Sequence, residues 1–498
     1  MNSSTSLASR ALLAVFLMVG FYILAIAVAG GLLYIPYAEM TYAHRLHFKL
    51  AIGCVIGALA ILWSVLPRAD KFEAPGPRLT RDQHPALFQE LEGVANSVQQ
   101  AMPVEVYLVP DVNAWVMQRG GTMGFGSQRV MGLGLPLMRM LTRSQFRAVL
   151  AHEFGHYHGG DTKLGPWIYK TRGTIGRTLG TLGEDSWLQL PFLWYGKMFL
   201  RITHAISRRQ EFVADELAAR TIGSQPLING LRTIHGVASA YNAYWFKVCA
   251  PVLNAGYQPP LTEGFQRFIQ ATPVAESIQQ QLEEELNTGQ ADPYDTHPPL
   301  KERIAAVAHL PAGDPGPEDP PATTLLGDVP ALESRLLAVL ADPEKAAQLQ
   351  PLEWDEVAPR VYLPAWTKLI QANLAALAGL TPLAFAAWAA DQKTSGLRLH
   401  FPDGESTAEE HAEELARNVA GAALCLLLVN RGARLVCEPG QPISLTLASV
   451  SIEPFGLIAS LTAGKLTEAA WQSQCRQLGI AASDLGQLVP PAGPPNPA

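Results

Sequence analysis

The 498-residue sequence contains few charged residues and few cysteines. Asp, Glu, Lys and Arg make up only 16% of it, and with a net charge of −7 it has no basic stripe of the kind that binds nucleic acid. Its five cysteines form no C-x-x-C pair and no even disulfide framework, which fits a reducing compartment. The glycines at 121–126 lack the strand-to-helix G-x-G-x-x-G spacing, so the sequence predicts no dinucleotide or phosphate loop.

Two long runs near the N-terminus, residues 11–37 and 50–67, contain no charged side chain. A helix rises about 1.5 Å per residue and must cross a hydrocarbon core of about 30 Å, so both runs are candidate spans. A signal peptide is the alternative for the first run because Arg10 precedes it. That run exceeds the usual apolar region of about 7–15 residues, and a second run follows it. We therefore expect a membrane-spanning helical hairpin in residues 1–70, with spans at about 11–35 and 50–67.

Basic residues are more numerous outside the two runs than between them. The positive-inside rule therefore predicts that both ends of the hairpin, and the domain that follows it, are cytoplasmic. The loop between the runs carries Arg45 and Lys49, whereas the flanks carry Arg10, Arg68, Lys71, Arg78 and Arg81.

The segment 151–156 reads A-H-E-F-G-H and contains an H-E-x-x-H motif. Residues four apart share one face of a helix, so His152 and His156 can direct two imidazoles at one zinc ion. Glu153 would lie beside a water molecule activated by the metal and act as a base. A chance match is the alternative. A capping-box sequence at 142–145 and apolar residues at helical spacing favour the helix.

A catalytic zinc usually has three protein ligands, so a third ligand is expected outside this helix. The run R-R-Q-E-F-V-A-D-E at 208–216 lies in a second predicted helix, from about 204 to 222. Glu211 and Asp215 are four apart and share a face. Glu211 can bind the metal, and Asp215 can accept the free N–H of a ligand histidine. A solvated acidic face that carries paired arginines is the alternative.

The segments H-E-F-G-H and E-F-V-A-D, in this order, resemble the signature of the membrane-associated zinc endopeptidases that include the heat-shock protease HtpX and the CAAX prenyl proteases. Two further segments fit the same pattern: a strand candidate at 104–109 that leads into D-V-N-A-W at 111–115, and T-H-P-P-L-K-E-R-I at 296–304. The resemblance covers about residues 75–310 and does not reach the last third of the chain.

The resemblance implies a gluzincin-type endopeptidase with one Zn²⁺ per chain in a bacterial inner membrane. The developing oxyanion needs a further donor, for which His297 is the candidate with Arg303 in support, although a histidine before two prolines also suits a turn. Asn113 would border the cleft, unless it only ends a strand in an Asp-x-Asn turn. Peptide or protein substrates, membrane proteins among them, would bind extended along a strand edge. The sequence does not indicate an oligomeric state.

The chain is too long for one soluble core, and a Pro-rich linker is expected at 311–325. We expect an α+β protein with the hairpin at 1–70, a mainly helical zincin catalytic domain with a small sheet at 71–310, and an α+β accessory domain at 326–489. Residues 490–498 are expected to be disordered. Residues 370–390 are uncharged, but a G-L-T-P break favours a buried helical hairpin over a span.

Two functions fit this organisation. The first is a membrane-bound zinc endopeptidase, with the quality control of membrane proteins as the role that the resemblance implies. The second is a catalytically silent membrane scaffold or binding protein that retains the peptidase fold. Glu153 favours the enzyme, because a scaffold needs no base between two metal ligands.

Overall fold

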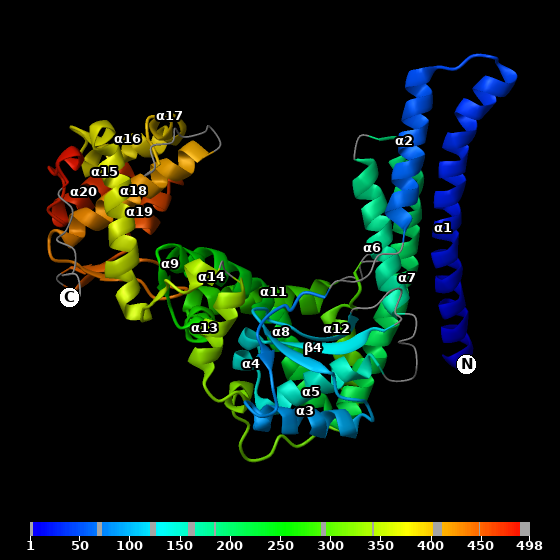
Figure 1. The fold of residues 1–498 in the computed structure, drawn as a ribbon. Coiled ribbons are helices and arrows are strands. Elements are labelled where there is room, and N and C mark those ends of the chain that lie inside the picture. Colours follow the sequence, from blue (N-terminus) through cyan, green and yellow to red (C-terminus); the bar gives the residue numbers. More distant parts are fainter. Residues whose placement is uncertain are drawn as a thin grey trace. The chain divides into compact units, whose positions relative to one another are not determined.

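The computed structural model describes residues 3–66, 72–119, 126–157, 165–183, 186–289, 295–340, 343–401, 411–447 and 449–488. Within these ranges the chain is mainly helical with small sheets, as expected (Figure 1). It divides into two compact units: Met1–Ala238 with Gln279–Leu340, and Ser239–Ile278 with Ala341–Ala498. The domain bounds proposed from the sequence remain predictions, and the tail at 490–498 lies outside the described residues.

Two N-terminal helices, α1 (Ser3–Tyr42) and α2 (Phe48–Val65), are long and apolar enough to cross a membrane. The candidate spans are Leu12–Tyr42 and Phe48–Val65, close to the expected 11–35 and 50–67. Position 67 and the flanking Arg68 and Lys71 lie outside the described residues. Large apolar side chains such as Phe16 and Trp63 are exposed on these helices, and such a surface suits contact with lipid.

The hairpin packs against α6 (Gly165–Leu182) and the first half of α7 (Gln189–Thr221), and the four helices share one apolar cluster (Figure 1). Phe21 of α1 and Phe192 of α7 are fully buried in it, and the Tyr195 hydroxyl donates to the Leu17 carbonyl at 2.6 Å. Trp194 is exposed on another side of α7. The aromatic stretch at 187–200 therefore contributes both to the core and to an exposed apolar face.

A four-stranded sheet has the order β1-β2-β4-β3. The inner strands β2 and β4 are parallel, and each outer strand is antiparallel to its neighbour. Because β3 pairs on one side only, it forms an edge of the sheet. The bounds are β1 (Arg78–Leu79), β2 (Glu105–Val109), β3 (Ala114–Arg119) and β4 (Gln128–Gly134).

Helices pack around this sheet, and the Pro-rich segment 311–325 is hydrogen-bonded to the same unit. The Ser224 amide donates to the Pro311 carbonyl at 2.9 Å, and the Arg143 amide donates to the Pro320 carbonyl at 2.8 Å. The chain enters the second unit at Ser239–Ile278, returns to the first, and leaves it again only after Leu340. The remaining elements that begin in this unit or return to it are α3 (Pro85–Ser97), α4 (Leu135–Met140), α5 (Arg143–Gly155), α8 (Ser224–Tyr244), α11 (Thr272–Thr288), α12 (Leu300–Val307), η3 (Ala322–Leu325) and α13 (Val329–Leu340).

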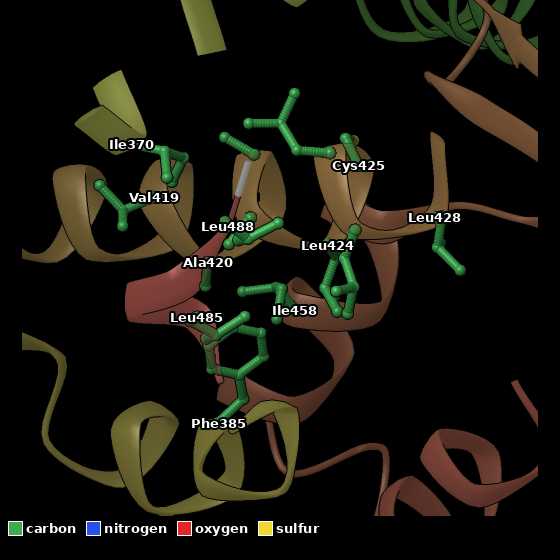
Figure 2. Close-up of a cluster of buried hydrophobic side chains, with 14 of the residues drawn as sticks. Ile370, Phe385, Val419, Ala420, Leu424, Cys425, Leu428, Ile458, Leu485 and Leu488 are labelled. Atoms are coloured by element: carbon green, nitrogen blue, oxygen red, sulfur yellow. The ribbon is translucent and has the colours of Figure 1, made fainter. Parts of the chain in front are cut away.

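The second unit has its own apolar core around α18 (Ala412–Val429), where Val419, Leu424 and Ile458 lie among the buried side chains (Figure 2). Ile370 and Phe385 are buried in the same core, on two helical segments that bend by 82° at the G-L-T-P break. The other elements of this unit are η2 (Trp245–Cys249), α9 (Ala250–Asn254), β5 (Tyr257–Gln258), α10 (Leu261–Gln270), α14 (Pro343–Ala346), β6 (Gln350–Pro351), η4 (Trp354–Glu356), η5 (Ala358–Tyr362), α15 (Leu363–Leu377), η6 (Pro382–Ala384), α16 (Phe385–Ala390), α17 (Gln392–Gly396), β7 (Arg434–Val436), β8 (Ser444–Leu447), β9 (Val450–Ile452), α19 (Pro454–Thr462), α20 (Glu468–Gln477) and η8 (Leu485–Gln487).

Candidate metal centre

Helix α5 carries the H-E-x-x-H motif at its C-terminal end, and its N-terminus is held by two separate groups. Thr142 caps the helix in a complete capping box with Gln145. From the Pro-rich segment, Asp319 accepts hydrogen bonds from the amide and the hydroxyl of Ser144, at 2.8 and 2.6 Å. A carboxylate at this position also interacts favourably with the helix dipole. The helix that presents the motif is therefore fixed at its start.

Helices α5 and α7 approach closely at Gly155 and Ala214. A Cβ atom added to Gly155 would lie 3.0 Å from the Ala214 Cα, which is tighter than ordinary packing. Two small residues at this crossing allow the backbones to meet. The approach brings Glu211 and Asp215 of α7 to the histidines of α5, where the sequence predicted them.

The two histidines and Glu211 converge on one point. Nε2 of His152 lies 3.5 Å from Glu211 Oε2, and Nε2 of His156 lies 3.4 Å from Glu211 Oε1. Two ligand atoms on one tetrahedral zinc ion lie about 3.3 Å apart, since each metal–ligand distance is about 2.0–2.1 Å. Within the described residues, Glu211 Oε2 is buried without a hydrogen-bond partner. The donors and the orphaned oxygen both fit a metal ion.

Glu153 lies beside this point, and its ligand atom and those of the two histidines are within 4.8 Å of one another. Burial raises the pKa of Glu153 to about 7, and the Glu211 carboxylate adds to the rise. His152, Arg303 and the backbone of Val116 oppose that rise. A carboxyl group that gains and loses a proton near neutral pH is suited to act as a base and then as an acid.

Asp215 and Arg303 form a buried pair behind His152. The Arg303 guanidinium donates from Nε and Nη2 to the two carboxylate oxygens, at 2.8 and 2.7 Å. Nδ1 of His152 lies 2.9 Å from Asp215 Oδ1, so this carboxylate can fix the orientation of the ring. Burial would raise the pKa of Asp215, but the hydrogen bonds from Arg303 and His152 hold it below its usual range.

The ionisation states of the three proposed ligands differ. Burial lowers the pKa of His156 to about 4, which favours the neutral imidazole that binds metals. Burial also acts on His152 in that direction, but the carboxylates of Asp215 and Glu211 together outweigh it and raise the pKa to about 10. Burial would raise the pKa of Glu211, but the two histidines and Arg303 lower it to about 2. Glu211 is thus an anion at neutral pH, with a charge that suits a cation between the histidines.

His297 and Asn113 both line the cleft above this point. Nε2 of His297 lies 3.9 Å from Glu211 Oε1, and its side chain is 57% exposed. Its backbone amide donates to Asp295 Oδ1 at 2.9 Å, so His297 is also part of a turn. Asn113 lies immediately before β3, and its carbonyl accepts the Gly134 amide at 2.9 Å. The structure therefore brings both residues to the site and leaves both of their sequence interpretations open.

The cleft has a volume of about 600 Å³ and includes residues that the sequence did not single out. Helix α8 contributes Leu227, Leu231 and His235, and α11 contributes Glu285. Nδ1 of His235 lies 2.8 Å from Glu285 Oε1. These helices follow the two motif helices in the chain and reach the site only through folding. The spacing of Leu227, Leu231 and His235 on one face was the available signal, but it is equally typical of a core-facing helix.

Residues 82–310 match the sequence model of Peptidase family M48. This region is therefore similar to M48 peptidase domains. It contains all eight residues proposed for the site, and the family implies a bound metal, generally zinc.

The curated proteins to which this chain is similar carry related names. Protease HtpX of Vibrio vulnificus (strain YJ016) is 29% identical over 168 residues, which cover 29% of this chain and 57% of that protein. Protease HtpX of Acinetobacter baylyi (strain ATCC 33305 / BD413 / ADP1) is 23% identical over 284 residues, or 52% and 82% of the two chains. Metalloprotease YcaL of Escherichia coli (strain K12) is 28% identical over 135 residues, or 26% and 50%. The chain thus spans little more than half of the Vibrio protein and half of YcaL, and no solved structure matches it.

Proposed function

We propose that this chain is a membrane-anchored zinc endopeptidase. The observation that carries the proposal is the convergence of His152, His156 and Glu211 on one point, with the partly buried carboxyl of Glu153 beside it. Three protein ligands leave a coordination position for chemistry, as in catalytic zinc sites. Glu153 argues against a silent scaffold, because a scaffold needs no base beside two metal ligands.

The residues of the site divide the chemistry among them. Bound zinc would supply a Lewis acid that polarises the scissile carbonyl and makes water more acidic. Glu153 accepts the proton of the attacking water and returns it to the leaving amine. Asp215, held by Arg303, orients His152. His297, exposed in the cleft, donates to the oxyanion that develops on the substrate.

The proposed substrates are extended peptide segments, including segments of membrane proteins. The cleft is bordered by Ala114 on the edge strand β3, where a peptide can add as a further strand. The two candidate spans support a position of the peptidase domain near a bilayer. We assign the enzyme to the bacterial inner membrane, with this domain cytoplasmic and with a role in membrane-protein quality control.

Zinc content and casein hydrolysis, measured on detergent-purified wild type and Glu153→Gln, test the proposal. We expect about one zinc in both proteins, and a loss of activity of about 100-fold or more in the variant because the base is removed. Glu216→Gln is the matched control, since Glu216 lies on α7 with a half-exposed side chain outside the site. It should keep full activity. Absence of zinc from the wild type, or activity equal to wild type in Glu153→Gln, would contradict the proposal; zinc without hydrolysis in all three proteins would favour the scaffold.

A further inference from the structure

Helix α5 and the turn that ends it carry a second pair of residues four apart, next to the metal-binding pair. Glu153 and Tyr157 both reach the edge strand β3, and both contact the backbone of Val116. The Tyr157 hydroxyl donates to the Val116 carbonyl at 2.9 Å. The Val116 backbone also hydrogen-bonds to the Glu153 carboxylate. One residue of the edge strand is thus held through both of its backbone groups.

The pairing of β3 with β4 shows which backbone N–H and C=O groups of β3 point away from β4. The Asn113 carbonyl accepts the Gly134 amide, so Asn113 directs its backbone toward β4. Backbone direction alternates along an antiparallel strand. Ala114 and Val116, which lie opposite Leu133 and Met131, therefore direct their N–H and C=O groups away from β4. The groups of Val116 are already bonded to α5, whereas Ala114 lines the cleft.

The phenol of Tyr157 is itself held in place. The Arg129 guanidinium of β4 lies 4.1 Å from the centre of the Tyr157 ring, in a cation–π contact. The ring is therefore fixed from the sheet while its hydroxyl is bonded to the edge strand. Removing the hydroxyl alone would leave this contact with Arg129 intact.

We infer that Tyr157 ends the part of the edge strand that a substrate can use, so that an extended peptide pairs with β3 at Ala114 and not at Val116. Tyr157 acts as a positioning residue, because it touches the strand rather than the reacting atoms. Since Glu153 contacts the same residue of β3, the register of the peptide is set relative to the base. This inference rests on the proposed peptidase function.

A scan of backbone N-methylation on one cleaved peptide tests the inference. Each position is methylated in turn, and kcat and KM are measured with wild type, Tyr157→Phe and Tyr107→Phe. Tyr107 is the matched control, because its hydroxyl also donates a bond within this sheet, to Glu105 at 2.7 Å, but on the inner strand β2. Equal zinc content in the three proteins shows that the site is intact.

For wild type and Tyr107→Phe we expect one sensitive position on the β3-facing side, where methylation lowers kcat/KM by about 2- to 10-fold through KM. Tyr157→Phe frees the Val116 carbonyl, so a second sensitive position should appear two residues from the first. Identical scans for wild type and Tyr157→Phe, or two alternating sensitive positions already in the wild type, would overturn the inference alone. If the wild type cleaves no peptide, the proposed function fails and the inference fails with it.

Discussion

Replacing Arg303 with methionine would remove a buried cation and keep an unbranched side chain of similar length. Arg303 is 4% exposed, and its two hydrogen bonds go to Asp215, which is fully buried. After the substitution, His152 is the neighbour left to compensate the Asp215 charge, at 2.9 Å. The variant therefore tests whether the Asp215–Arg303 pair supports the metal ligand or only the fold.

Two costs are expected. Removing one partner of a buried ion pair destabilises a protein by about 3–5 kcal/mol, because the other charge stays buried without its partner. In addition, Arg303 lowers the pKa of His152 and Asp215 raises it, so the variant favours a protonated His152 that cannot bind a metal. Loss of such an outer partner typically lowers metal affinity by about 10–100-fold, which corresponds to about 1.4–2.7 kcal/mol.

The assay is zinc retention against increasing chelator at several pH values, together with thermal unfolding in detergent. Arg220→Met is the matched control, since Arg220 lies on α7 and its pair with Glu216, at 2.8 Å, has both side chains more than half exposed. This control should change stability by less than about 1 kcal/mol. Because the histidine must be neutral to bind zinc and its pKa is already about 10, the deficit of Arg303→Met should stay the same at pH values well below 10 and shrink only as the pH rises toward that value.

The double variant Asp215→Asn with Arg303→Met separates the two costs. It removes the stranded charge, so its stability should exceed that of Arg303→Met, while its zinc affinity stays low because His152 has lost its carboxylate partner. Equal zinc retention by Arg303→Met and Arg220→Met at every pH would refute the reasoning.

Two further outcomes are expected. Asp319→Ala removes the two bonds to Ser144, so the free energy of unfolding should fall by about 1 kcal/mol at pH 7 in denaturant titrations. Burial tends to raise the pKa of Asp319, but the hydrogen bonds from Ser144 lower it by more. The pKa of Asp319 in the folded protein therefore lies below its unfolded value of about 3.9. The stabilisation by Asp319 is thus present above about pH 4 and is lost as the pH falls through the folded pKa. If the difference in unfolding free energy between wild type and Asp319→Ala did not vary with pH, the Asp319 charge would not be its cause. The orientation in the membrane can be tested by adding protease to intact spheroplasts. A cytoplasmic domain at residues 82–310 should be spared before lysis and cut after it, whereas cutting before lysis would place this domain outside.

Local periodicity explains why much of the candidate metal site could be predicted. A helix places residues four apart on one face whatever surrounds it, so the pairs His152/His156 and Glu211/Asp215 follow from spacing alone. The contact between Arg303 and Asp215 joins positions 88 apart in the sequence, and no local pattern encodes it. Only the resemblance to a family suggested a supporting role for Arg303.

The contacts of the Pro-rich segment could not be predicted from its composition. Prolines at 311–325 predicted a linker because proline cannot donate a backbone hydrogen bond and interrupts helices. Proline keeps its carbonyl, however, and the carbonyls of Pro311 and Pro320 accept bonds from Ser224 and Arg143. Which donors meet those carbonyls is decided by the packing of distant elements, which composition does not describe.

Helix α5 connects the fold to the proposed chemistry through each of its sides. Its start is held by Thr142 and Asp319, and one face meets α7 at Gly155, where the third proposed ligand arrives. The neighbouring face holds β3 through Glu153 and Tyr157. The same four-residue spacing therefore serves twice: once to direct two imidazoles at a metal, and once to fix the strand along which a substrate would lie. A displacement of this helix would alter the metal site and the substrate register together, so variants at its contacts should change zinc affinity and peptide selectivity in parallel.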